Sequence, residues 1–130
     1  AFDQLHFVGL FEKRNILAGA LTISQRKRLE IARALCTKPQ LILLDEVMGG
    51  LNPSEVREIL QLIEKMRKAG NTLFIIEHIM AAIMSLCDRI LVLHHGQKIA
   101  QGTPQEVGSD PQVIKAYLGK EYVLAQNPRT

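Results

Sequence analysis

Two acidic residues, Asp45 and Glu46, directly follow an apolar run, LILL at residues 41–44. Four apolar residues without polar alternation are too few for a helix and are typical of a buried parallel strand. Ligands bind at the carboxyl ends of such strands, where an acidic pair can hold a cation and polarise a water molecule. The alternative is an ordinary acidic loop without catalytic purpose.

A histidine, His78, stands at the end of a second apolar run. Residues 72–76, TLFII, are β-branched and aromatic and predict another buried strand, which Glu77 and His78 follow. Taken alone, such a histidine is more often a solvated or capping residue than a catalyst. His94 and His95 share no metal-ligand spacing with Cys87, so this part of the chain does not predict a metal site.

Two helices are predicted to position these residues. Residues 25–38 alternate basic and apolar side chains and predict an amphipathic helix with Ser24 as its N-cap. Its start exposes backbone N–H groups that attract phosphate. The sequence NPSE at 52–55 supplies an N-cap, a proline and a carboxylate for a helix over 54–68, which Gly70 ends.

The remaining elements are short. Residues 90–93 and 98–100 predict a hairpin, and helix-start residues recur at Thr103 and Asp110. The patterns also predict a helix over 79–87 and one over 113–118, with Gly119 as C-cap.

Composition narrows the class of protein. The 130 residues are 47% apolar, which suits one domain or part of one, and no apolar run approaches the length of a membrane span. A net charge of +3 with 5% aromatic residues does not predict a nucleic-acid surface. Cys36 and Cys87 lie in apolar helical contexts and predict buried, reduced thiols.

The order of the motifs resembles the second half of an ABC-type ATPase. A signature-like motif within 21–35 precedes a Walker B pattern at 41–46, and a D-loop, GLNP, and a switch histidine follow. The segments RLEIARAL, GTPQEV and VIKAYLG are similar to the ATP-binding subunits of branched-chain amino-acid importers. The resemblance covers nearly the whole chain.

This resemblance implies a role for each motif. Asp45 would hold Mg²⁺, Glu46 would activate or orient the attacking water, and His78 would bond the γ-phosphate. The signature and D-loop would contact ATP across a dimer interface. Their residues are Leu21, Thr22, Ile23, Ser24, Gln25, Gly50, Leu51 and Asn52.

The sequence departs from the family pattern at two places. The usual signature is LSGGQ or LSYGQ, of which Leu21 and Gln25 match. Ser24 replaces a glycine that lies close to phosphate, so we expect weakened function, a hydroxyl that can still donate to phosphate, and higher activity for Ser24→Gly in a full-length dimer. Val47 replaces a proline, which would let the strand continue one residue further.

The chain contains no phosphate-binding G-x-x-x-x-G-K-[ST] motif, and its one Gly-Lys pair is Gly119-Lys120. We therefore expect a carboxyl-terminal fragment or truncated product of an ATPase, which by itself binds Mg-ATP weakly or not at all and is inactive. The predicted fold class is α/β, a partial P-loop-type nucleotide-binding domain. We expect a single incomplete domain with a helical subdomain and signature helix (1–38), a part of the catalytic core (39–102) and a helical tail (103–130).

The resemblance predicts an ATP-hydrolysing subunit of an ABC importer, with ATP and Mg²⁺ as cofactors. Its partners would be a second ATPase subunit and membrane-spanning permease subunits at the cytoplasmic face of the inner membrane, with no nucleic acid. The alternative is a non-catalytic interaction module with a degenerate signature. A DNA-repair-type ABC ATPase is disfavoured because no heptad run precedes the signature. The solute stays open, with branched-chain amino acids inferred from the last third of the chain.

Overall fold

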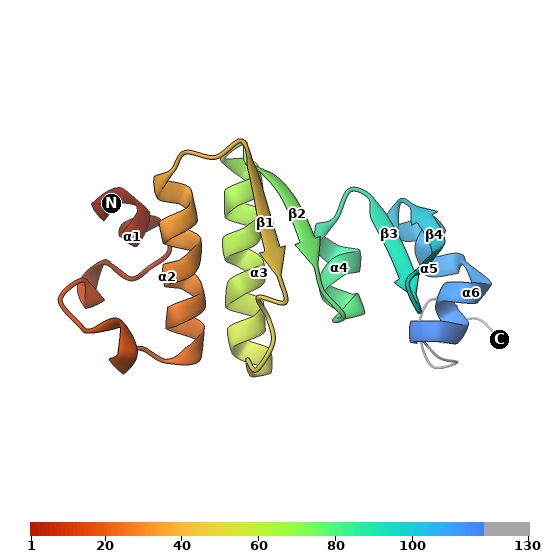
Figure 1. Cartoon of the computed structure of the whole chain (residues 1–130), viewed down its shortest axis with the longest axis horizontal. Coiled ribbons are helices and arrows are strands. Elements are labelled where there is room, and N and C mark those ends of the chain that lie inside the picture. The colour runs from red at the N-terminus through yellow and green to blue at the C-terminus, as the bar shows by residue number, and fades with distance from the viewer. Residues whose placement is uncertain (119–130) are drawn as a thin grey trace. The chain divides into compact units, whose positions relative to one another are not determined.

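The computed structural model describes residues 1–118 and shows two compact units, Ala1–Glu77 and a second that begins at His78 (Figure 1). The predicted C-cap, Gly119, lies outside the described residues. Among residues 1–118, no helix combines the length and apolar character that crossing a bilayer requires.

The first unit is built on a pair of parallel strands. β1 (Leu41–Asp45) pairs with β2 (Thr72–Ile76) in a register that runs from Leu41 opposite Thr72 to Asp45 opposite Ile76. The helices are α1 (Phe2–Phe7), α2 (Ile23–Cys36) and α3 (Pro53–Lys68), with short 3-10 turns at Phe11–Lys13 and Ala18–Ala20. The predicted α/β class with parallel strands is confirmed.

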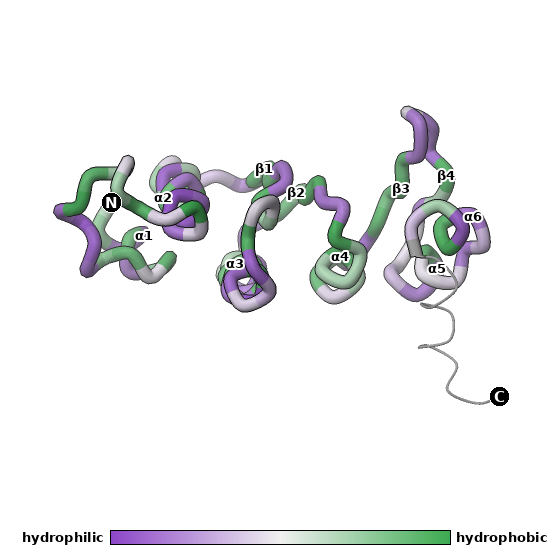
Figure 2. The backbone as a smooth tube through the Cα atoms, turned by 90° about the horizontal axis from the view of Figure 1, so that it is seen from below, coloured by the Kyte–Doolittle hydropathy of each residue, from purple (hydrophilic) through white to green (hydrophobic). Residues whose placement is uncertain are grey.

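Helix α3 covers one face of this strand pair (Figures 1 and 2). Its apolar stripe is buried, as are Ile42 and Leu44 of β1. The other face exposes four large apolar side chains: Leu41 (53%), Leu43 (70%), Phe74 (58%) and Ile76 (53%). The prediction of strands buried on both faces is therefore wrong for this face, because the described residues of the unit cover only the opposite one.

Both long helices begin with a capping box. In this motif the side chain of the N-cap residue accepts a hydrogen bond from the backbone N–H three residues on, and the side chain of that later residue accepts one from the backbone N–H of the N-cap. For α3 the partners are Asn52 and Glu55, as predicted. For α2 they are Thr22 and Gln25, so the prediction of Ser24 as N-cap is wrong. Thr22 competes successfully because its hydroxyl reaches the N–H group three residues on, while Ser24 lies inside the first turn.

β1 ends at Asp45 and does not continue past it, contrary to the expectation from Val47. Glu46 adopts φ +46°, a left-handed conformation that no strand residue has. The Glu46 N–H nevertheless donates to the carbonyl oxygen of Ile76 at 2.9 Å, so the ladder gains one more hydrogen bond before the chain turns.

The second unit consists of a hairpin and short helices. β3 (Ile90–His94) and β4 (Gln97–Gly102) are antiparallel and joined at His95 and Gly96, which both have positive φ. α4 (Met80–Leu86) precedes the hairpin, and α5 (Pro104–Ser109) and α6 (Pro111–Val113) follow it. The predicted helix over 113–118 is instead the end of α6 followed by a π-helical turn, Ile114–Leu118.

Candidate functional site

The two acids of the Walker B pattern lie where the parallel strands end. Asp45 is the last residue of β1, opposite Ile76 of β2, and Glu46 follows it. Both acidic residues are exposed. By strand alternation, Asp45 shares the open face of the sheet with Leu43. The edge therefore presents two accessible carboxylates at the position where open α/β sheets bind ligands.

This donor set fits magnesium. The described residues contain no group of three or more His, Cys, Asp or Glu side chains that could hold a metal ion by themselves. Mg²⁺ in nucleotide sites takes one or two protein carboxylates and completes its shell with phosphate and water oxygens. Asp45 is thus a suitable single protein ligand for a magnesium ion that arrives with a triphosphate.

The D-loop residues form the accessible turn into α3. Gly50 has φ +75°, a conformation that a side chain would strain, and it is exposed. The Asn52 side chain accepts hydrogen bonds from the N–H groups of Ser54 (2.9 Å) and Glu55 (3.0 Å). The Asn52 side-chain oxygen is thus committed to the helix cap, while Gly50 is exposed and Leu51 is half-buried in the turn before it.

The signature residues divide between the core and the surface. Leu21 and Ser24 are buried, Ile23 is 51% exposed, and Thr22 and Gln25 bond each other in the capping box. Ser24 has no positive φ, so it carries none of the backbone strain that its replacement of glycine suggested. Its buried side chain does not fit the expected hydroxyl contact with phosphate. The N–H groups of Ile23 and Ser24, at the start of the helix, are better candidates.

His78 is exposed and directly follows Glu77 in the chain. It is the first residue of the second unit, whereas Asp45 and Glu46 belong to the first. Its role in phosphate binding stays a prediction.

Two residues that the sequence did not single out contact the acidic loop. The Lys27 ammonium donates to the carbonyl oxygen of Glu46 at 3.1 Å, and the Glu77 carboxylate accepts from the N–H of Met48 at 2.8 Å. Lys27 stands between Arg26 and Arg28, and a run of basic residues of this kind usually marks a solvated helix face. Glu77 stands directly before His78, which has the more recognisable functional pattern. Their spacing from residue 46 in the sequence gives no signal of these contacts.

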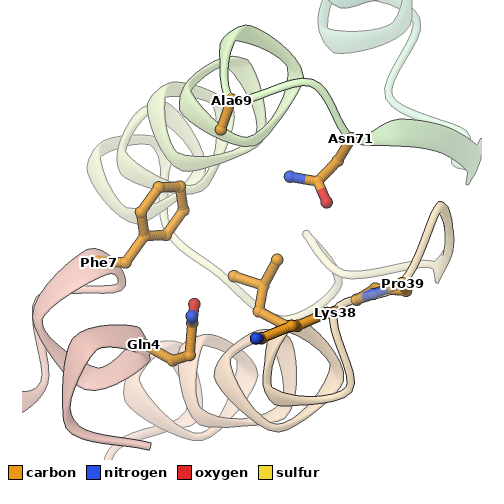
Figure 3. Close-up of a pocket in the computed structure, with 7 residues that line it drawn as sticks. Gln4, Phe7, Lys38, Pro39, Ala69 and Asn71 are labelled. Carbon is orange, nitrogen blue, oxygen red and sulfur yellow. The ribbon is translucent and has the colours of Figure 1, made fainter.

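A pocket of about 230 Å³ lies at the opposite end of the strands (Figure 3). Pro39 and Asn71 line it just before β1 and β2 begin, and Phe7 of α1 and Lys38 face it. The pocket is therefore separated from Asp45 and Glu46 by the length of the strands. It is not the candidate nucleotide site.

The two cysteines differ in environment. Cys36, at the end of α2, is exposed, so the prediction of a buried thiol is wrong for this residue. Cys87 is half-buried, and desolvation, with a smaller contribution from the nearby Asp88 charge, raises the pKa of its thiol.

Two family models match separate parts of the chain. Residues 2–49 match the ABC transporter model, and residues 97–123 match the model of the branched-chain amino acid ATP-binding cassette transporter. The first match spans the signature and the acidic pair, and the second begins with β4. Both matches agree with the motif order along the chain.

Similar proteins support the same assignment. The chain is 45% identical to the high-affinity branched-chain amino acid transport ATP-binding protein BraF of Pseudomonas aeruginosa, over 92% of this chain and 48% of BraF. It is 38% identical to the lipopolysaccharide export system ATP-binding protein LptB of Acidithiobacillus ferridurans, over 94% of this chain and 49% of LptB. The chain thus spans about half the length of the curated relatives that it matches.

A solved structure shows the same fold. The ADP conformation of MJ1267, an ATP-binding cassette of an ABC transporter, matches with a TM-score of 0.81 and 34% identity, over 92% of this chain and 48% of MJ1267. The sequence matches and the structural match therefore each cover most of the chain and indicate the same kind of protein. On both grounds, most of the chain is similar in sequence and in fold to the ATP-binding proteins of ABC transporters.

Proposed function

We propose that this chain is part of the ATP-hydrolysing subunit of an ABC importer for branched-chain amino acids. The observation that carries the proposal is the parallel register of β1 and β2, which brings Asp45 and Glu46 to the edge where β2 also ends. Open α/β sheets bind ligands at this edge, and the accessible carboxylates there suit a Mg-nucleotide.

The chain's own residues would divide the work as follows. Asp45 offers a carboxylate ligand to the metal, and Glu46 accepts or orients a proton of the attacking water. His78 donates a hydrogen bond toward the terminal phosphate. Bound Mg²⁺ would neutralise charge that develops on the phosphate oxygens.

The signature and D-loop residues would act across an interface with a second ATPase subunit. Helix α2 has 14 residues, and its N-terminal N–H groups, at Ile23 and Ser24, suit a phosphate of the partner's nucleotide. The accessible turn at Gly50 and Leu51 would run along the same interface. The other proposed partners are membrane-spanning permease subunits.

A surface for the permease is available on α1 and on the segment that connects α1 to α2. This part of the chain exposes the large apolar side chains of Phe2 (64%), Ile16 and Leu17 (83%), and it carries none of the acidic residues of the nucleotide site. Exposed apolar groups of this kind mark interaction surfaces. Through such contacts the subunit would lie peripherally at the cytoplasmic face of the inner membrane.

The solute assignment rests on the carboxyl-terminal match. Residues 97–123 match a model that is described for branched-chain amino acid transporters, and BraF carries that function in its name. Lipopolysaccharide export is the second candidate, favoured by the 38% identity to LptB. The two candidates differ in solute and share the ATPase chemistry.

A chimeric subunit tests this proposal. The segment of BraF that aligns with this chain is replaced by the chain itself, and leucine uptake is measured in cells that lack BraF. We expect uptake to be restored by the chimera and abolished by Glu46→Gln in it. A chimera that binds ATP yet restores no uptake, while the corresponding LptB chimera supports growth without native LptB, would transfer the assignment to lipopolysaccharide export.

The alternative function is a non-catalytic interaction module, favoured by the three signature positions that depart from the family pattern. It predicts that Glu46→Gln leaves uptake by the chimera unchanged.

A further inference from the structure

The turn that carries Glu46 has an unusual backbone. Glu46 adopts φ +46°, which is unfavourable for a residue with a side chain. The residues that follow, Val47 to Gly50, contain no proline to fix φ and two glycines that widen the conformational choice. A local bond, from the N–H of Gly49 to the carbonyl oxygen of Glu46 (3.1 Å), closes the turn. The sequence of the turn alone therefore specifies its conformation weakly.

Glu77 holds the middle of this turn from the end of β2. Its Oε1 accepts a hydrogen bond from the N–H of Met48 at 2.8 Å, in a partly buried position. The Met48 side chain is 1% exposed, so the turn is anchored in the core at the same residue. Hydrogen bonds to a carboxylate are stronger than those between neutral groups.

Lys27 holds the start of the turn from α2. Its Nζ donates to the carbonyl oxygen of Glu46 at 3.1 Å, and this oxygen also accepts the N–H of Gly49. The N–H of Glu46 is itself bonded to Ile76. The backbone of Glu46 is thus fixed on its amino side by β2 and on its carbonyl side by α2.

We infer that Lys27 and Glu77 are positioning residues that hold the Glu46 backbone in its left-handed conformation and so aim the Glu46 carboxylate. Each acts through the backbone of the turn. Lys27 lies on the helix whose start carries the signature residues, so the same contact joins that helix to the acidic turn. The catalytic meaning of this arrangement rests on the proposed function, whereas the arrangement itself does not.

Amide hydrogen exchange on the 130-residue chain tests the arrangement without nucleotide. Glu77→Ala removes the acceptor, so exchange at Met48 should accelerate by about tenfold or more, because exchange reports the local opening of the bonded structure. Glu77→Gln keeps an acceptor oxygen and should restore most of the protection. Lys27→Met should accelerate exchange at Gly49. Lys27→Arg keeps a donor and should restore the slow exchange of the parent.

A matched control separates this effect from general loosening. Lys65 also donates its ammonium to a backbone carbonyl, that of Phe7 at 3.0 Å, away from the turn. Lys65→Met should leave exchange at Met48 and Gly49 unchanged. Unchanged exchange at Met48 in Glu77→Ala, or equal acceleration in Lys65→Met, would overturn the inference.

Activity of the BraF chimera supplies the functional readout. Lys27→Met and Glu77→Ala should each lower kcat by about tenfold with KM for ATP unchanged, since a misaimed carboxylate affects the chemical step. Lys27→Arg and Glu77→Gln should recover kcat. An unchanged kcat in an active chimera would overturn the positioning role. An inactive parent chimera would count against the proposed function, and hydrogen exchange would still decide the arrangement.

Discussion

At the scale of single residues, local environment determines which of two chemically identical groups reacts. Cys36 is exposed at the end of α2, whereas Cys87 is half-buried and burial raises the pKa of its thiol. The thiolate is the reactive form, so half-burial and the raised pKa both slow the reaction of Cys87. Brief treatment with iodoacetamide at pH 8 should therefore label Cys36 first.

Peptide mass spectrometry at successive times measures the labelling rates of both cysteines. In Cys36→Ser, only the slow labelling of Cys87 should remain. Equal rates at the two cysteines would contradict their assigned environments.

Residue types and their spacing predicted Asp45, Glu46 and Asn52 in their observed places, because each stands next to a strand end or helix start that the pattern defines. Lys27 and Glu77 were not predictable in this way. Their contacts with the turn at residues 46–48 depend on how α2 and β2 pack in three dimensions. The positions of these residues in the sequence do not reveal that packing.

At the scale of elements, caps set where the helices begin. Asn52 accepts two N–H groups at the start of α3, so Asn52→Ala should lower the free energy of unfolding by about 1 kcal/mol. Asn52→Asp retains the acceptor and serves as the control. Urea unfolding followed by circular dichroism measures the difference. An Asn52→Ala chain as stable as the parent would show that α3 does not depend on this cap.

The start of α5 should depend on pH through Glu106. Its carboxylate accepts hydrogen bonds from the N–H (2.7 Å) and hydroxyl (3.0 Å) of Thr103, and these lower the pKa of Glu106 below its usual 4.5. A lowered folded-state pKa stabilises the folded form above the unfolded-state pKa, and the contribution disappears as pH falls through the folded value. We therefore expect the capping box to weaken only below about pH 4.5.

Titration of the Glu106 carboxyl carbon by NMR measures this pKa. In Gly102→Ala, a Cβ would lie 2.5 Å from Glu106 Oε2 and displace the carboxylate, so the pKa of Glu106 should rise. The same pKa in both chains would contradict the contact.

Helix starts, strand positions and the hairpin were predictable because caps, apolar periodicity and turn residues are local signals. The end of β1 was not, since the left-handed conformation of Glu46 is stabilised by tertiary contacts. The N-cap of α2 was misplaced by two residues although the sequence carries the signal, because Gln25 stands three residues after Thr22, which is the spacing of a capping box, whereas Lys27 stands three residues after Ser24.

At the scale of the whole molecule, the strands carry more apolar surface than the described residues cover. Both apolar runs are typical of strands that are buried on two faces, yet Leu43 and Phe74 are exposed on the face opposite α3. Neighbouring side chains on that face, Leu41 and Ile76, are exposed as well. A patch of this kind, on a sheet whose two strands pair only with each other among residues 1–118, favours association with further protein surface.

We expect the 130-residue chain to self-associate through this face. Leu43→Lys combined with Phe74→Lys should shift the chain toward monomer in sedimentation velocity, because two charges on the patch oppose its burial. Gln61→Lys, on the exposed surface of α3, adds a charge elsewhere and should leave the distribution unchanged. Equal sedimentation of the double variant and the parent would exclude this face.

We propose that ATP is hydrolysed at the edge formed by the ends of β1 and β2, with Glu46 acting on the attacking water. Single-turnover hydrolysis of ATP by the BraF chimera tests it most directly, because this measurement separates the chemical step from binding and product release. Glu46→Gln should lower the single-turnover rate by about 100-fold or more with ATP binding retained. A Glu46→Gln chimera that binds ATP and hydrolyses it at the parent rate would contradict this role of Glu46.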